Sequence, residues 1–232
     1  MKVGKIRLDR INKDIALRYC GMKKDKLQLI DDIFERLEPE LLQAIDSRYV
    51  YEEFTIKEIE DGESPFVSFD NCELELRGHS ITEHLRKCEK AIFICLTLSA
   101  DVDRLIRQKE VLDMTEAYLC DAAASAVIED ALDLLEEEIH ADYSDYYMTF
   151  RFGIGYGDLS LEHQKDFLRI LDSQRKIGVG LTSGNMLSPA KSVTVIIGLS
   201  REEIKEKKRN NCLSCRLRSD CEFRRKGIRC YE

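Results

Sequence analysis

The chain has 232 residues, 44% of them hydrophobic, which is enough for one main domain plus a small appendage. The charged fraction of 34% and the net charge of −8 describe an acidic protein with no general attraction for nucleic acid or anionic lipid. The sequence contains neither a secretion signal nor an apolar run approaching the roughly 20 residues of a membrane span, so we expect a cytoplasmic protein without a membrane partner.

The first third of the chain changes from a helical to a strand pattern. Apolar residues recur at spacings of three and four from Leu27 to Ile45 and predict a helix that Pro39 kinks or restarts. Alternation from Tyr49 to Ile59, followed by short runs at Phe66–Phe69 and Cys72–Leu76, predicts edge or antiparallel strands. This part is therefore expected to form a helical layer followed by part of a sheet.

The middle of the chain holds the strongest core signals. Ser80 is predicted to cap a helix that runs through Cys88, and Ala91–Leu98 has the near-continuous apolar run of a central strand buried on both faces. A wide apolar face predicts one long core helix from about Val111 to His140. The run Glu136–Glu138 is interpreted as the solvent-exposed side of that helix.

The remainder of the main domain mixes short strands with helices. Tyr146–Phe150 is predicted to be a strand, Ser160 to cap a helix, and Gly178–Leu181 and Ser192–Ile197 to be two further strands. Ser200–Glu203 has the form of a capping box that opens a short helix. Because helices and strands do not alternate strictly, we predict an α+β fold with a mixed, largely antiparallel central sheet flanked by helices.

The composition divides the chain into a main domain, residues 1–200, and a basic cysteine-rich tail, residues 201–232. The tail has eleven Lys or Arg against six Asp or Glu. Its spacing Cys212-x2-Cys215-x5-Cys221-x8-Cys230 places four thiols in a stretch with too few apolar residues to fold by packing. We therefore predict that these cysteines bind a metal, either zinc or an iron–sulfur cluster. The other cysteines are scattered and are expected to pack as reduced thiols.

A glycine-rich segment is the candidate ligand site. Gly153, Gly155 and Gly157 lie between a predicted strand and a predicted helix, and glycine lets a ligand reach the main chain without meeting a Cβ. Arg151 offers a planar fork for a carboxylate, and Tyr156 offers an aromatic face and a hydroxyl. The set suits an amino-acid or nucleoside ligand, although a tight turn beside a surface arginine is the alternative reading of the pattern.

Motifs that follow this segment carry a family resemblance. Arg151-x-x-x-Gly155-Tyr156, Ile177-Gly-Val-Gly-Leu-Thr182 and Pro189-x-Lys-Ser192-Val193 resemble, in order and spacing, the S-adenosylmethionine-binding activation domain of cobalamin-dependent methionine synthase. Ala16–Met22 and Leu76–Ile81 look like stretches of the free-standing members of that family. The sequence departs from the family pattern at Ile154, Gly157 and Ser183, which affects the shape of the pocket more than the presence of Arg151 and Tyr156.

The resemblance implies a cofactor and a set of binding residues. Arg151 would bind the carboxylate of S-adenosylmethionine, and Gly155 and Tyr156 would line its sulfonium end, with Gly153 in the same segment. An acidic residue of the long helix also contributes in the family, and Glu129 is its counterpart here. No catalytic side chain is implied, and whether the chain is itself an enzyme stays open.

The resemblance also implies partners. The chain would be a reactivation component that supports reductive remethylation of the cobalamin held by methionine synthase or another corrinoid protein. The electron would come from a flavodoxin or a ferredoxin, and an iron–sulfur cluster in the tail would suit its delivery. The alternative is a non-catalytic, metal-stabilised binding or regulatory module whose basic tail contacts an acidic protein or nucleic acid.

Overall fold

The computed structural model of the protein describes residues 1–20 and 27–204. The helices are α1 (Lys13–Tyr19), α2 (Leu27–Ala44), α3 (His79–Leu85), α4 (Ala100–Leu112), α5 (Met114–Asp142), α6 (His163–Ile170) and α7 (Ser173–Ile177). The strands are β1 (Lys2–Lys5), β2 (Arg48–Glu60), β3 (Phe66–Phe69), β4 (Cys72–Arg77), β5 (Lys90–Thr97), β6 (Tyr147–Met148), β7 (Phe152–Gly153), β8 (Gly180–Leu181), β9 (Leu187–Ser188) and β10 (Ser192–Ser200).

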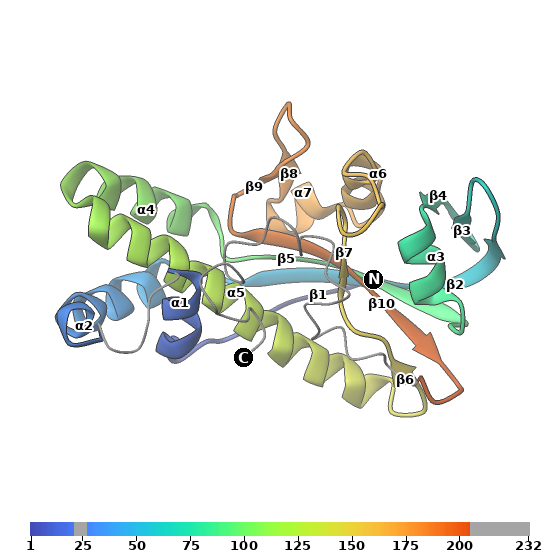
Figure 1. The fold of residues 1–232 in the computed structure, drawn as a ribbon, viewed down its shortest axis with the longest axis horizontal. Helices are drawn as coiled ribbons and strands as arrows, with labels where there is room; N and C mark the ends of the chain where they lie inside the picture. Colours follow the sequence, from blue (N-terminus) through green and yellow to red (C-terminus); the bar gives the residue numbers. More distant parts are fainter. Residues whose placement is uncertain (21–26, 205–232) are drawn as a thin grey trace.

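An antiparallel sheet lies at the centre of the molecule (Figure 1). In the part of the chain that the structure describes it has eight strands, in the order β4-β3-β2-β5-β10-β6, with β1 paired to β2 and β7 paired to β10. All its strand pairs are antiparallel. Together with the helices around the sheet, this arrangement confirms the predicted α+β fold and the central position of the apolar strand, β5.

Strand β5 supplies side chains to both layers of the core, because successive residues of a strand point to opposite faces. Ile92, Ile94 and Leu96 pack with the second half of α5 on one face. Phe93 and Cys95 pack on the other face, together with residues of α3, α6 and α7. Figure 1 shows α5 on one side of the sheet and α6 and α7 on the other.

A third cluster joins α1, α2 and α4 to the first half of α5 (Figure 1). Small side chains of α5 at Ala122–Ala124 and Ala126 are buried there and let the neighbouring helices approach closely. Leu41 of α2 and Val102 of α4 are fully buried in the same cluster. The first half of α5 thus packs against helices and its second half against the sheet.

The long core helix predicted from about Val111 to His140 is confirmed as α5, which begins at Met114 because α4 ends at Leu112 and Asp113 separates the two helices. Asp113 has extended backbone, and its carboxylate accepts hydrogen bonds from the N–H groups of Thr115 (2.7 Å) and Glu116 (3.3 Å). These bonds satisfy donors of the first turn of α5. The sequence pattern does not predict the earlier part of α4, because its apolar stripe is narrow.

Three smaller expectations also differ from the structure. Helix α2 continues through Pro39 instead of restarting, with Leu37 and Leu41 buried on either side of the proline. The strand predicted at Gly178–Leu181 is the short strand β8, which pairs with β9, a strand that the sequence pattern does not predict, in a separate two-stranded sheet. Residues 201–204 are not helical: Ser200 ends β10, and its hydroxyl accepts a hydrogen bond from the N–H of Glu202 (3.1 Å).

No helix within residues 1–20 and 27–204 is long and apolar enough to cross a membrane. The predicted tail lies almost entirely outside the described residues, and so do all four of its cysteines. The division of the chain at residue 200 therefore stays a prediction.

Phe93 tests the packing of the sheet against α6. Its ring centroid lies 4.7 Å from that of Phe54, 5.0 Å from that of Phe69 and 4.8 Å from that of Phe167. We expect Phe93→Ala to lower the free energy of unfolding by about 3–5 kcal/mol in urea denaturation, because it removes a buried ring and leaves a cavity. Val111→Ala, at a side chain 85% exposed, is the control and should change it by less than about 0.5 kcal/mol. Equal losses would contradict this packing.

Candidate functional site

Arg151 lies at the edge of the sheet, in the connection between β6 and β7. The pairing of β7 with β10 places Phe152 opposite Ile196 and Gly153 opposite Val195. Phe152 is fully buried in the core on the α3 and α6 side of the sheet. Because successive side chains of an extended chain point to opposite faces, Arg151 points towards the face that α5 covers.

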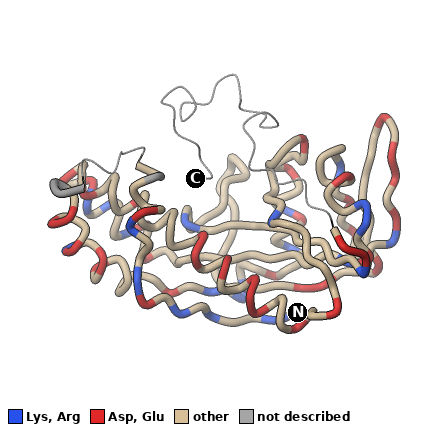
Figure 2. Tube along the Cα trace, turned by 60° about the horizontal axis from the view of Figure 1, so that its bottom comes forward, with Lys and Arg blue, Asp and Glu red and all other residues tan. Residues whose placement is uncertain are grey.

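The guanidinium group of Arg151 forms ion pairs with three carboxylates of α5. Nη1 lies 2.7 Å from Asp133, Nε lies 3.2 Å from Glu136 and Nη2 lies 3.3 Å from Glu129. Spacings of four and three residues place these carboxylates on one face of the helix. Figure 2 shows Asp and Glu recurring along α5. Three carboxylates around one guanidinium leave a formal local charge of about −2.

Burial and charge act in opposite directions at this site. Burial lowers the pKa of Arg151, but attraction to Glu136, Asp133 and Glu129 outweighs it and raises that pKa above its ordinary value. Burial raises the pKa of Glu129; Arg151 lowers it, while Asp133 and Asp130 raise it further. The Arg151 side chain is still 23% exposed, so a ligand can reach the charged group.

The structure brings together two predicted site residues, Arg151 and Glu129, which are 22 positions apart in the chain. It also adds Asp133 and Glu136, which the sequence does not identify as site residues. The interpretation of Glu136 as solvent-exposed is wrong, because its side chain is half-buried and paired with Arg151. The helical spacing of the carboxylates was a usable signal, but only the tertiary fold shows which cation lies opposite them.

The lysine of the Pro-x-Lys-Ser-Val motif, Lys191, meets α5 nearer its N-terminus. Its ammonium group lies 2.8 Å from the carboxylate of Asp121 and donates a hydrogen bond of 2.8 Å to the hydroxyl of Ser125. Asp121, Ser125, Glu129 and Asp133 follow one another at intervals of four, so they form a slowly winding polar stripe. Arg151 and Lys191, which belong to two of the motifs that resemble the activation domain, therefore both contact the polar stripe of α5.

The glycine-rich segment packs tightly against side chains of the protein itself. An added Cβ would come within 3.1 Å of a side-chain atom at each position, of Tyr156 for Gly153, of Leu161 for Gly155 and of Ser80 for Gly157. Gly155 and Gly157 also have φ values of +91° and +58°. The turn and its packing therefore favour glycine at Gly155 and Gly157, which is a different reason from the open ligand approach inferred from the sequence. At Gly153 a Cβ would require the ring of Tyr156 to shift slightly.

Asp158 directly follows this segment and binds it to α3. Its carboxylate accepts hydrogen bonds from the N–H groups of His79 (2.7 Å) and Ser80 (2.8 Å). Burial raises the pKa of Asp158, but these bonds outweigh burial and lower the pKa below its ordinary value. The prediction that Ser80 caps this helix is wrong, because Ser80 lies inside α3 and Asp158 accepts from its first turn.

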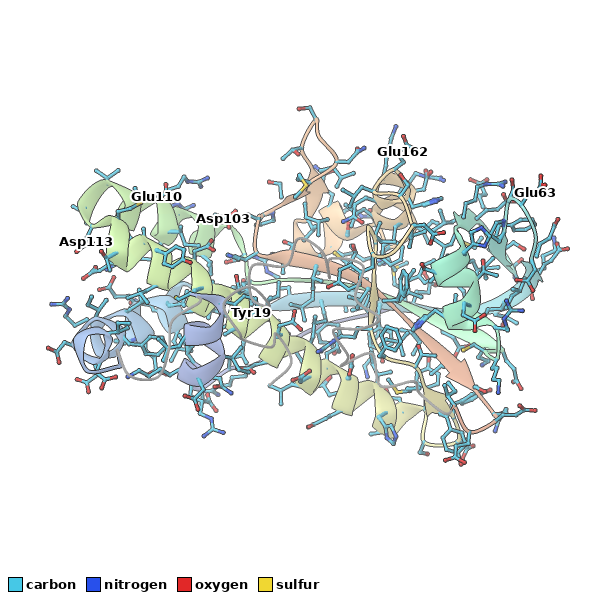
Figure 3. The ribbon with its side chains drawn as sticks, in the orientation of Figure 1. Tyr19, Glu63, Asp103, Glu110, Asp113 and Glu162 are labelled. Atoms are coloured by element: carbon cyan, nitrogen blue, oxygen red, sulfur yellow. The ribbon has the colours of Figure 1, made fainter. Side chains whose placement is uncertain are left out.

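Tyr19 is a neighbour of the site that the sequence pattern does not single out. It is the last residue of α1, beside α5 (Figure 3), and is 45% exposed. Burial is the main cause of the raised pKa of its hydroxyl. Glu129 and Tyr156 raise this pKa further, whereas Arg151 lowers it. A hydrogen bond from the hydroxyl of Tyr118 to the carbonyl of Cys20 (3.4 Å) holds the end of α1 against α5.

A cavity of about 800 Å³ adjoins the ion pairs at Asp133. It lies between α5, where Asp130 and Leu134 line it, and the segment 7–14 that leads from β1 into α1. Arg10 and Asn12 line the opposite wall. Small-molecule sites have volumes of roughly 300–1,000 Å³, so this space is large enough for a nucleoside.

The cysteines of the described chain are buried or half-buried thiols. Cys20, Cys72, Cys88, Cys95 and Cys120 are all free. Burial raises the pKa of Cys20 to about 11 and that of Cys88 to about 12, so these thiols stay protonated. Among residues 1–20 and 27–204 there is no group of three or more His, Cys, Asp or Glu residues arranged to hold a metal ion.

Comparison with known proteins gives a match at the level of fold. No protein-family model matches the sequence, and no curated protein matches it either. The structure is similar to the crystal structure of the MetH reactivation domain bound to AdoHcy, with a TM-score of 0.61 and 13% sequence identity. The match covers 100% of this chain and 87% of that one, so the two chains share a fold over nearly their whole lengths.

Gly157 tests the packing of the glycine-rich segment. We expect Gly157→Ala to destabilise the protein, because its Cβ would lie 2.3 Å from the Ser80 hydroxyl and its φ of +58° is unfavourable for alanine. Gly178→Ala is the matched control, since Gly178 has a φ of +78° but nothing within 4 Å of the added Cβ. The control should cost about 1–2 kcal/mol in urea denaturation and Gly157→Ala clearly more. Equal costs would show that Ser80 moves aside freely.

Proposed function

We propose that this protein binds S-adenosylmethionine at Arg151 and supports reductive remethylation of cobalamin on methionine synthase or a related corrinoid protein. The cobalamin would be carried by that partner. The observation that carries the proposal is the hydrogen bond between Arg151 and Glu129 of α5. Arg151 belongs to the segment that resembles the cofactor-binding motif of the activation domain. In this proposal Gly153, Gly155 and Tyr156 complete the binding segment.

The charges at Arg151 suit the amino-acid end of this ligand. An α-amino acid carries a carboxylate and an ammonium group on the same carbon atom. Through charge-assisted hydrogen bonds, a guanidinium can bind the carboxylate of such a ligand, and the neighbouring carboxylates can bind its ammonium group. Since Arg151 is already paired with Glu129, Asp133 and Glu136, the ligand carboxylate would displace at least one of them, and that carboxylate would then be available to the ligand ammonium.

The surroundings of Arg151 suit the rest of the ligand. The cavity between α5 and the segment 7–14 has Asp133, a partner of Arg151, among its lining residues, and its volume of about 800 Å³ is within the range of small-molecule sites. Tyr19 and Tyr156 add aromatic side chains that are 45% and 58% exposed. The fold shared with the reactivation domain, whose structure was determined with AdoHcy bound, agrees with a ligand of this class.

The chemistry asked of the protein is mainly orientation. S-adenosylmethionine supplies the methyl group, and reduced cobalamin is a strong nucleophile, so the reaction does not need a general base. The side chains around Arg151 would hold the ligand so that its methyl group faces the incoming partner. The rigid turn from Gly153 to Asp158, bound to α3, would keep Tyr156 in a fixed position beside that group.

Arg151→Ala tests the proposal through equilibrium binding of S-adenosylmethionine, measured by isothermal titration calorimetry. We expect binding by the unmodified protein and an affinity at least about tenfold lower in the variant, corresponding to about 1.4 kcal/mol, because the ligand carboxylate loses a charged partner. Glu129→Gln should weaken binding in the same direction.

Arg175→Ala is the control for the loss of an arginine, since Arg175 is 83% exposed and pairs with Asp172 away from the site. The affinity of this variant for S-adenosylmethionine should equal that of the unmodified protein. Absence of detectable binding by the unmodified protein, or equal affinities of Arg151→Ala and the control, would overturn the proposed function. Circular dichroism of each variant separates a loss of binding from a loss of folding.

The predicted tail site is tested by metal analysis of the full chain purified without oxygen. We expect bound metal that is lost when Cys212 and Cys215 are replaced by serine, because thiolates are the ligands of both candidate centres. An iron–sulfur cluster gives visible absorbance together with iron and sulfide, whereas zinc, with its filled d shell, gives no visible band. Protein free of iron and zinc would contradict the predicted metal site.

A further inference from the structure

Arg151 lies in an irregular part of the sheet edge. Strand β10 pairs with Met148 through Leu199 and with Phe152 through Ile196. Between these two pairs, three residues of the β6–β7 connection lie opposite two residues of β10, which is the arrangement of a β-bulge. A bulge bends the chain and changes the direction of its side chains, so the direction of Arg151 depends on the groups that hold the bulge in place.

Thr149 anchors this bulge to β10. Its N–H donates a hydrogen bond to the carbonyl of Gly198 (2.9 Å), and the N–H of Gly198 donates one to Oγ1 of Thr149 (2.8 Å). In a regular antiparallel pair the second bond would end on the main-chain carbonyl of the opposite residue. Thr149 is buried, and its hydroxyl takes the place of that carbonyl.

His84 of α3 supports Thr149 and the residues beside Arg151. Nε2 of His84 lies 2.9 Å from Oγ1 of Thr149, within hydrogen-bond distance. The centroid of the His84 ring lies 4.5 Å from that of Phe150 and 5.0 Å from that of Phe152. One side chain of α3 thus contacts the anchor of the bulge and both chain neighbours of Arg151.

Helix α3 therefore holds the segment from Thr149 to Asp158 at both ends. Its first turn donates two hydrogen bonds to the carboxylate of Asp158, and His84 lies in its last turn. The helix is itself fixed on the sheet by side chains that are fully buried in the core. The main chain that carries Arg151 is thus held from the α3 face of the sheet, whereas its guanidinium group is held from the α5 face.

This second support has a consequence for ligand binding. In the proposed function the ligand carboxylate displaces at least one α5 carboxylate from Arg151. An arginine held only by those carboxylates would then be free to change its rotamer. A main chain that is fixed from the opposite face keeps the start of the side chain in place, so less ordering is needed for the guanidinium to meet the ligand.

We infer that Thr149 and His84 are positioning residues that keep Arg151 directed at the ligand carboxylate while the α5 carboxylates exchange partners. The inference rests on the proposed function and adds two residues that act through Arg151. Thr149 supplies the hydroxyl that closes the bulge, and His84 holds that hydroxyl and packs against the neighbouring rings. Their effect is therefore on the binding of a carboxylate and not on the binding of a nucleoside.

Thr149→Val tests the inference, because valine has the shape of threonine without the hydroxyl, whereas Thr149→Ser keeps the hydroxyl. The ligands for calorimetry are S-adenosylmethionine and decarboxylated S-adenosylmethionine, which lacks only the carboxylate. We expect Thr149→Val to lower the affinity for S-adenosylmethionine about fivefold, because a displaced guanidinium forms a poorer charge-assisted hydrogen bond. The affinity of this variant for the decarboxylated ligand should stay within about twofold, and Thr149→Ser should bind both ligands as the unmodified protein does.

His84→Phe tests the other positioning residue. Phenylalanine keeps an aromatic ring beside Phe150 and removes the nitrogen that faces Thr149. The variant should lower the affinity for S-adenosylmethionine in the same direction as Thr149→Val. In the double variant the loss should be smaller than the product of the two single losses, because both residues act through one network.

Thr194→Val is the matched control for the loss of a buried hydroxyl. Thr194 is buried in β10 and donates a hydrogen bond of 2.9 Å to the side chain of Gln164. Like Thr149→Val, this variant should lower the free energy of unfolding in urea denaturation, because it leaves a buried polar group without its partner. It should bind S-adenosylmethionine as the unmodified protein does.

A second measurement needs no ligand. Nε of Arg151 lies 3.2 Å from the carboxylate of Glu136, so its N–H signal in a proton–nitrogen correlation NMR spectrum reports the position of the guanidinium. The signal is assigned by its loss in Arg151→Lys. We expect Thr149→Val to shift this signal, and Thr149→Ser and Thr194→Val to leave it unchanged.

The outcomes separate the inference from the proposed function. If Thr149→Val weakens the binding of both ligands equally, or if Thr194→Val weakens the binding of S-adenosylmethionine as much, the inference is wrong and the proposed function survives. An Arg151 signal that is the same in Thr149→Val and in the unmodified protein contradicts the inference as well. If the unmodified protein does not bind S-adenosylmethionine, the proposed function fails and the inference fails with it.

Discussion

The ion pairs of Arg151 with α5 connect the edge of the sheet to the helix that covers it, and the candidate site depends on this contact. The apolar face of α5 packs on β5 and β10, which leaves its polar stripe at the border of the interface. Arg151 meets the stripe at Glu129, Asp133 and Glu136, and Lys191 meets it at Asp121. Because the sheet positions both cations, any change in the packing of α5 would move the charges of the site.

The glycine-rich segment, which follows Arg151 in the chain, is held on the opposite face of the sheet from α5. Phe152 is buried among α3 and α6, and Asp158 accepts two hydrogen bonds from the start of α3. Tyr156 lies over Gly153, where an added Cβ would come within 3.1 Å of its ring. The segment that carries Arg151 is thus fixed at both ends before any ligand arrives, so less conformational entropy would be lost on binding.

The charge distribution links fold to function. A shared fold does not by itself assign an activity, because one fold supports many sites. Here the fold places a guanidinium, a surplus of carboxylates, two exposed tyrosines and a cavity in one region. Opposite charges suit an amino-acid group, which carries a carboxylate and an ammonium group on the same carbon atom. The proposed ligand carries such a group, which is why the site and the sequence resemblance lead to the same proposal.

The sequence by itself determined the fold class, the central strand and the segment proposed to bind a ligand, because these follow from local periodicity and from residues close together in the chain. Arg151, Gly155 and Tyr156 are part of such a local motif. The break at Asp113, the helix cap provided by Asp158 and the roles of Asp133 and Glu136 were decided by the tertiary structure. Each depends on groups that are distant in sequence or on competition between a local cap and a continuous helix. Helical spacing alone places the carboxylates on one face, and only the pairing of β7 with β10 brings a guanidinium to meet them.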